Sequence, residues 1–164
     1  MKFLFDEGIR GKLKALFDEY LFYGGLPEVV LSPEYKKLQI LQDYFRTVMV
    51  KDIARSEIRN YRLLSNFLRL LINSKFFSIS KIYNILKSLG YKVGKNTLSD
   101  YLSRAEEAFL VDTVQFYSPK TKVKLQLPRK VYVLDNGYVS ALTTNTDKGR
   151  LLENLVYLEL KRRY

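Results

Sequence analysis

The chain has 164 residues, with 28 Lys and Arg against 17 Asp and Glu, and it contains neither histidine nor cysteine. A chain of this length can bury roughly 68–70% of its unfolded surface, so its core needs neither a disulfide nor a metal. The missing residue types exclude Cys/His zinc sites, thiol nucleophiles, serine–histidine pairs and histidine acid–base chemistry. The net charge of +11 points to a polyanionic partner.

Apolar periodicity predicts three helices in the first half of the chain. They are expected over 10–22, from Ser32-Pro33-Glu34 to about Ala54, and near 61–73. Gly24-Gly25-Leu26-Pro27 ends the first, because glycine and proline both interrupt helices. We expect all three apolar stripes to lie in the core. They are Leu13, Leu16, Phe17, Tyr20 and Leu21; Leu38, Leu41, Phe45, Val48 and Met49; and Leu64, Phe67, Leu68 and Leu71.

Two further helices are predicted after residue 76. Ser78 or Ser80 can cap the first of them, which ends at Gly90. A short basic turn over 91–96 follows, and Thr97-Leu98-Ser99-Asp100 matches a capping box that starts the second. The expected buried residues are Ile82, Ile85, Leu86 and Leu89 in the first helix, and Leu98, Tyr101, Leu102, Ala105, Ala108 and Phe109 in the second.

A strand pattern comes next. Val114 and Phe116 alternate with polar neighbours, 118–121 is typical of a turn, and Val123, Leu125 and Leu127 alternate with polar residues up to Pro128. The apolar run 131–134 predicts a short buried strand. Three helices followed by a basic hairpin is the order of a winged helix-turn-helix; a helical bundle with an attached hairpin would give a similar pattern. A last helix is expected over 149–163; it stops at Tyr164, which is typical of a fragment end.

The positive charge is concentrated in the middle of the chain. Residues 1–34 carry a net charge of −2, whereas 60–109 carry +5 and 110–134 carry +4. A charge that served only solubility would be spread more evenly. No apolar run reaches the roughly 18 residues of a membrane-spanning helix, and the start turns acidic too early for a signal peptide. We therefore expect a cytoplasmic protein with no membrane partner.

No catalytic chemistry is predicted for this chain. Residues 90–96 (GYKVGKN) superficially match a phosphate-binding P-loop, but they are one residue short, end in Asn and follow a helix, so we interpret them as a turn. Glu153 and Glu159 are six residues apart and do not share a helix face. Asp135 precedes Asn136-Gly137, which is a turn signal. We predict no catalytic residue and no metal ligand.

Basic and polar residues are found at the two places where a winged helix contacts DNA. The second helix of the helix-turn-helix enters the major groove by its N-terminal end, and the wing reaches phosphates or the minor groove. Glu106 and Glu107 lie on the same helix and would repel phosphate if they faced it. The predicted contacts are Lys92, Lys95, Asn96, Ser99 and Arg104 from the helix, and Lys120, Lys122, Lys124, Arg129 and Lys130 from the wing.

Several stretches together resemble the C-terminal region of archaeal-type P-loop ATPases of the AAA/STAND group. They are 20–30 (YLFYGGLPEVV), 50–53 (VKDI), 97–102 (TLSDYL), 130–137 (KVYVLDNG) and 149–163. The resemblance implies an ATPase core that this chain lacks, followed by a helical lid, a winged helix and a nuclease-like domain. ATP and Mg²⁺ would bind in that core. Gly25 and Pro27 would sense the nucleotide if the core were present, and Glu153 would match a glutamate of the nuclease-like domain.

We therefore predict a mainly α fold of the α+β class. It comprises a helical lid-like segment over 1–60, a winged helix-turn-helix with a small β-hairpin wing over 61–140, and a linker with a C-terminal helix, the first of an incomplete nuclease-like domain, over 141–164. The expected function is a non-catalytic DNA-binding or regulatory region of an ATPase. Its expected partners are duplex DNA, the missing ATPase core and a second copy of the chain. The alternative is a protein-interaction module, acting within one chain or between subunits, that does not bind DNA.

Overall fold

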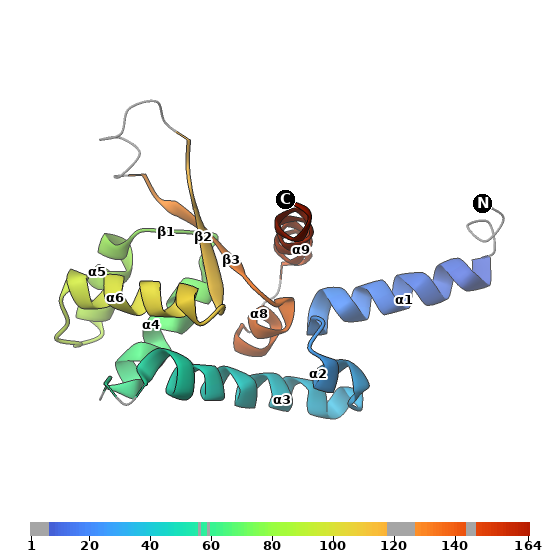
Figure 1. Ribbon diagram of the computed structural model, residues 1–164, viewed down its shortest axis with the longest axis horizontal. Helices are drawn as coiled ribbons and strands as arrows, with labels where there is room; N and C mark the ends of the chain where they lie inside the picture. The colour runs from blue at the N-terminus through green and yellow to red at the C-terminus, as the bar shows by residue number, and fades with distance from the viewer. Residues whose placement is uncertain (1–6, 56, 59, 118–126, 144–146) are drawn as a thin grey trace. The chain divides into compact units, whose positions relative to one another are not determined.

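The computed structural model describes residues 7–55, 57–58, 60–117, 127–143 and 147–164 (Figure 1). This part of the chain is mainly helical with a small three-stranded antiparallel sheet, so the predicted fold class is confirmed. The chain divides into two compact units. We call 1–42 with 135–164 the terminal unit, and 43–134 the central unit. None of the helices in the described ranges is both long and apolar enough to cross a bilayer.

The terminal unit joins the two ends of the sequence. It contains α1 (Glu7–Tyr23), α2 (Pro27–Leu31), the first part of α3 (Glu34–Thr47), α8 (Asn136–Leu142) and α9 (Lys148–Arg163). α1 contacts both α8 and α9. The predicted segments 1–60 and 141–164 therefore do not correspond to separate units, because residues just after β3 hydrogen-bond to the end of α1 and the turn that follows it.

The apolar stripe predicted for the first helix is only partly buried. Leu21 lies in the core, but Leu13, Leu16 and Phe17 are 53%, 62% and 44% exposed. The expectation that this stripe lies in the core is therefore wrong for the first three turns of α1. Periodicity shows that a helix has an apolar face, but it does not show whether the chain supplies anything to cover that face.

α3 is shorter than predicted. It ends at Thr47 and continues as a π-helical segment, η2 (Val48–Ala54), which stops at Arg55 in the left-handed region with φ 45°. Leu41, Phe45 and Met49 are buried as expected, whereas Leu38 is exposed. The neighbouring Lys37 is buried instead, because its ammonium group has partners in the terminal unit.

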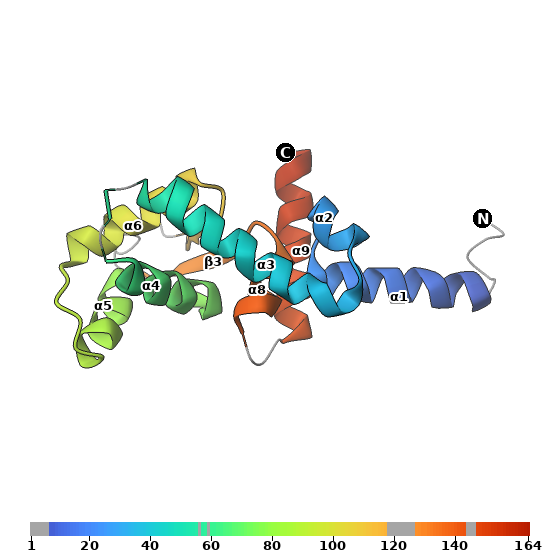
Figure 2. The same cartoon turned by 90° about the horizontal axis from the view of Figure 1, so that it is seen from below.

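The central unit contains the three helices predicted after residue 60, and a short strand that was not predicted lies between the first two of them. The unit contains α4 (Tyr61–Asn73), β1 (Phe76–Phe77), α5 (Ile79–Ser88), α6 (Lys95–Glu107), β2 (Val111–Gln115) and β3 (Arg129–Val133). The strand order is β1-β3-β2, and both pairings are antiparallel. α4 and α6 contact the sheet (Figures 1 and 2). The predicted core residues of α4 are confirmed: Leu64, Phe67, Leu68 and Leu71 are fully buried.

Of the two caps predicted for α5 and α6, the structure has the first but not the second. Ser78 caps α5, since its Oγ accepts the N–H of Lys81 at 3.2 Å, and Gly90 follows the helix at φ 85°. The capping box at Thr97–Asp100 is wrong: α6 begins at Lys95, three residues earlier than this box predicts, and its N-cap, Gly94, has no side chain that could form a cap. Leu89 and Phe109 are exposed rather than buried, because each lies just beyond the last turn of its helix.

Asp135 does not precede a turn, as Asn136-Gly137 had suggested. Its carboxylate caps α8 by accepting the N–H of Gly137, so the helix starts after only Leu134 and Asp135 have followed β3. The helix predicted over 149–163 is confirmed as α9. The predicted turn at 118–121 and the strand residues Val123 and Leu125 lie outside the described residues.

Candidate nucleic-acid interface

Four of the predicted contacts lie exposed at the start of α6: Lys92, Lys95, Asn96 and Ser99. Lys95 Nζ donates to Ser80 Oγ at 3.0 Å and lies 5.5 Å from the centre of the Tyr83 ring. Lys87 of α5 lies 6.0 Å from the same ring. The lysines of two helices therefore converge on one aromatic side chain. Lys87 is not among the contacts predicted from the sequence, although Tyr83 and Lys87 are one helical turn apart. We call Lys87, Lys92, Lys95, Asn96 and Ser99 the basic cluster.

The surroundings of the basic cluster favour an anion. Between Glu57 and Asp100 the sequence has eight Lys and Arg and not one Asp or Glu. Because Gly94 gives no side-chain cap, the first N–H groups of α6 are not neutralised by a carboxylate or hydroxyl of the N-cap residue. The positive end of the helix dipole adds to the charge of the lysines. The start of α6 is thus suited to phosphate.

Arg104 does not belong to this cluster. Its Nη2 binds a carboxylate oxygen of Glu57, its Nε lies 3.1 Å from Asp100 Oδ2, and its Nη1 donates to the carbonyl of Ile53 at 3.4 Å. Only 21% of the side chain is exposed. The guanidinium group links α6 to η2 and the segment after it, so we remove Arg104 from the predicted DNA contacts.

The acidic residues of α6 have partners inside the central unit. Glu106 Oε1 accepts the hydroxyl of Thr113 at 2.6 Å, and Glu107 lies 3.9 Å from Arg55. Both lie in the last turn of α6, at the opposite end from the basic cluster. The conflict expected between these glutamates and phosphate therefore does not arise at the start of the helix.

The wing residues are described only at its base. Lys120, Lys122 and Lys124 lie outside the described residues. Arg129 and Lys130 begin β3, where Arg129 is paired with Phe77 and Gln115, and Lys130 with Phe76 and Val114. Lys130 Nζ lies 5.3 Å from the Phe76 ring centre and 5.7 Å from that of Tyr132. This lysine is thus placed over aromatic rings on the sheet.

The Gly24–Pro27 turn is held by Asp135. Gly25 N donates to Asp135 Oδ2 at 2.9 Å. Gly24 has φ 77°, and a Cβ at that position would overlap the Asp135 carboxylate, so both features require glycine. Burial raises the pKa of Asp135, while the N–H groups of Gly25 and Gly137 and the charge of Arg162 lower it. The ATPase resemblance assigns Gly25 and Pro27 to nucleotide sensing; in this structure the N–H of Gly25 is bound to Asp135.

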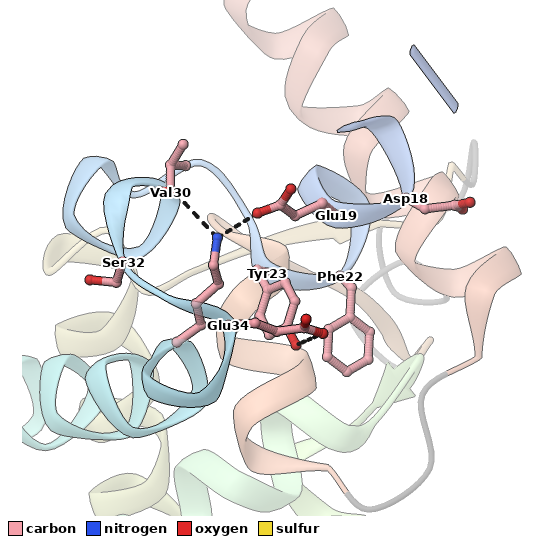
Figure 3. A pocket seen from close by; sticks show the side chains of 8 residues that line it. Asp18, Glu19, Phe22, Tyr23, Val30, Ser32 and Glu34 are labelled. Carbon is pink, nitrogen blue, oxygen red and sulfur yellow. Dashed lines mark hydrogen bonds and ion pairs between the residues drawn. The ribbon is translucent and has the colours of Figure 1, made fainter. Parts of the chain in front are cut away.

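A cavity of about 610 Å³ lies beside this turn, between α1, α2 and α3 (Figure 3). Lys37, 4% exposed, binds Glu19, donates to the Val30 carbonyl at 3.3 Å and lies 5.4 Å from the Tyr23 ring centre. Tyr23 donates to Glu34 at 3.3 Å. Three carboxylates against one lysine would repel a phosphate. The lining residues are Asp18, Glu19, Phe22, Tyr23, Val30, Ser32, Glu34 and Lys37.

The family described as "Domain of unknown function (DUF8612)" matches residues 14–149. The chain belongs to this family. The DUF8612 match includes the Gly24–Pro27 turn, the whole basic cluster, Asp135 and the buried start of α8, and it extends just into α9. Both units are therefore features of the family's domain.

Two curated relatives are similar to almost the whole DUF8612 chain. The uncharacterized protein MJ1544 of Methanocaldococcus jannaschii is 34% identical over 94% of this chain and 35% of its own length. An uncharacterized protein of Haemophilus influenzae is 32% identical over 90% of this chain and 38% of its own length. The chain thus spans little more than a third of these relatives. No solved structure matches it.

Proposed function

We propose that the central unit binds duplex DNA, with the start of α6 directed into the major groove. The observation that supports this most is the basic cluster, which is exposed, contains three lysines and lies at a helix N-terminus without a capping carboxylate. Lysines and a helix N-terminus contact phosphates. Asn96 has the side chain that pairs best with adenine in the major groove.

The charge of the two units supports the same proposal. The central unit has 17 Lys and Arg against 7 Asp and Glu, a net charge of +10, whereas the terminal unit has a net charge of +1. A duplex would meet a strongly positive central unit, and the attraction would fall with rising salt as counterions are released. We also propose, from the ATPase resemblance and the greater length of the relatives, that this unit serves a larger ATPase whose nucleotide and Mg²⁺ bind outside this chain.

Replacing two lysines of the basic cluster should reduce both affinity and salt dependence. In K92A/K95A, the loss of two phosphate contacts should lower the slope of log Kd against log salt by about 1.8, since each contact contributes roughly 0.9. Fluorescence anisotropy with a labelled duplex at several salt concentrations measures this slope. K12A/K14A is the matched control, because it removes the same charge from exposed positions of α1. Equal losses in both variants would contradict the proposal.

A second candidate function, protein interaction, is favoured by the exposed stripe of α1. Leu13, Leu16 and Phe17 form a continuous apolar strip on one helix face. Apolar strips of this kind often bind another protein surface. We propose that this strip associates with the same strip of a second subunit.

The double substitution L13K/L16K should abolish such association. Both side chains are more than half exposed, so the free energy of unfolding should change by less than about 0.5 kcal/mol. Light scattering during size-exclusion chromatography, over a range of concentrations, should show the wild type associating and the variant monomeric. A wild type that stays monomeric at every concentration would remove this candidate.

A further inference from the structure

The sheet of the central unit presents an exposed aromatic face. Phe76 of β1 and Val114 of β2 pair with Lys130 of β3 from its two sides, so the three side chains share one face of the sheet. Tyr132 lies on the same face, because side chains two residues apart on a strand point the same way. Phe116, the residue after β2, is placed there by its ring contact with Phe76. The alternate residues Phe77, Val111, Val131 and Val133 are buried in the core.

Two rings on this face form an open platform. Phe76 and Phe116 stack with their centres 5.4 Å apart and their planes at 28°. Each side chain is still 43% exposed. Lys130 places its ammonium group over Phe76 and Tyr132. Exposed stacked rings beside a cation are unusual on a surface that only faces water.

The positive charge around the platform favours a negatively charged ligand. The central unit has a net charge of +10, so a basic partner is disfavoured. Among the described residues of the sheet, Asp112 is the one carboxylate. It pairs with Tyr132 and so lies on the same face, where its Oδ1 accepts the N–H of Thr113. Flat apolar rings next to Lys130 match a ligand that has planar bases and a phosphate backbone. Proteins that bind single strands combine these two features.

We propose that Phe76, Phe116 and Lys130 bind the unpaired bases of a single-stranded nucleic acid. This rests on the proposed function in that nucleic acid is the partner, and it adds a second site for unpaired bases. In a duplex the base faces are stacked inside the helix, so the platform requires a single strand or a single-stranded tail. Its residues differ from those of the basic cluster, which allows each site to be tested alone.

The test is the double variant F76L/F116L with fluorescein-labelled poly-dT. Leucine keeps an apolar side chain in each position but removes the ring, so the urea midpoint should stay close to that of the wild type. Affinity should fall roughly 5- to 150-fold for the loss of one stacked base, since each stacked base contributes about 1–3 kcal/mol. Y61L is the matched control, because Tyr61 is exposed to a similar extent (41%) on α4; it should bind as the wild type does.

An abasic oligonucleotide of the same length separates stacking from charge. It keeps the phosphates, so the wild type should bind it as weakly as F76L/F116L binds poly-dT. The proposal is overturned if F76L/F116L binds poly-dT as tightly as the wild type, or if the wild type does not distinguish poly-dT from the abasic strand. A duplex without single-stranded tails tests the basic cluster independently of the aromatic platform. Of the two double variants, only K92A/K95A should bind this duplex more weakly than the wild type does, whatever the outcome with poly-dT.

Discussion

Replacing Asn136 by alanine should destabilise the terminal unit by about 3–5 kcal/mol. Asn136 Nδ2 donates to the carbonyls of Leu21 and Leu151, each at 3.0 Å, and Asn154 Nδ2 donates to Asn136 Oδ1 at 2.8 Å. One side chain thus joins α1, α8 and α9. Leu21 is in the last turn of α1, where carbonyls have no partner within the helix. In N136A the buried carbonyl oxygen of Leu21 would have no hydrogen-bond donor, and a buried acceptor without a donor lowers the free energy of unfolding.

A serine on the same helix provides the control for this prediction. Ser140 is buried in α8, and its hydroxyl is the one buried side-chain group among the described residues without a hydrogen-bond partner. Ser140→Ala should therefore keep or slightly raise the free energy of unfolding. Urea denaturation followed by far-UV circular dichroism compares N136A, S140A and the wild type. A loss below about 1 kcal/mol in N136A would show that the three helices do not depend on this side chain.

Replacing Asp135 by alanine should cost about 2–4 kcal/mol of stability. The change removes the cap of α8, which contributes about 1 kcal/mol. It also removes the acceptor of the Gly25 N–H, at a further cost of about 1–3 kcal/mol. The same urea denaturation measures the loss. D147A is a suitable control, because Asp147 also caps a helix, α9; its replacement should cost about 1 kcal/mol, the usual contribution of a cap.

The pH dependence of D135N gives an independent check on the same carboxyl group. Burial raises the pKa of Asp135 above its ordinary 3.8, so the folded chain binds this proton more tightly than the unfolded chain does. The stability from this group is fully present below pH 3.8 and is lost as the pH rises through the raised pKa. The wild type should therefore lose stability relative to D135N as the pH rises through this interval. A difference that does not change with pH would contradict the assignment.

The sequence predicted what depends on local patterns. Period and composition identified α4, α5, α6 and α9, the Ser78 cap and the fully buried residues of α4. The exposed residues of the basic cluster on α6 were also predictable, because the spacing of charged residues along a helix can be taken directly from the sequence.

Features that depend on distant residues were not predictable. Asn136-Gly137 suggested a turn, but glycine is needed at 137 because a Cβ there would overlap the Tyr23 carbonyl and the Leu41 side chain. From the sequence, Arg104 was predicted to contact DNA, but the structure pairs its guanidinium group with Glu57, which is 47 residues away in the chain. Phe76 and Phe116 are forty residues apart, and only the pairing of β1 and β2 with β3 brings their rings together.

The division of the chain has a consequence for how the domain can be taken apart. Residues 43–134 are continuous, whereas the terminal unit needs residues from both sides of them. The central unit is therefore an insertion, and the polypeptide enters and leaves it once each. A protease cut within the central unit would leave both halves of the terminal unit intact but no longer joined by peptide bonds. After such a cut, their association would depend on contacts that involve no peptide bond: the hydrogen bonds of Asp135 and Asn136, the packing of α1 against α8 and α9, and, for a cut between β2 and β3, the pairing of β3 with β1 and β2.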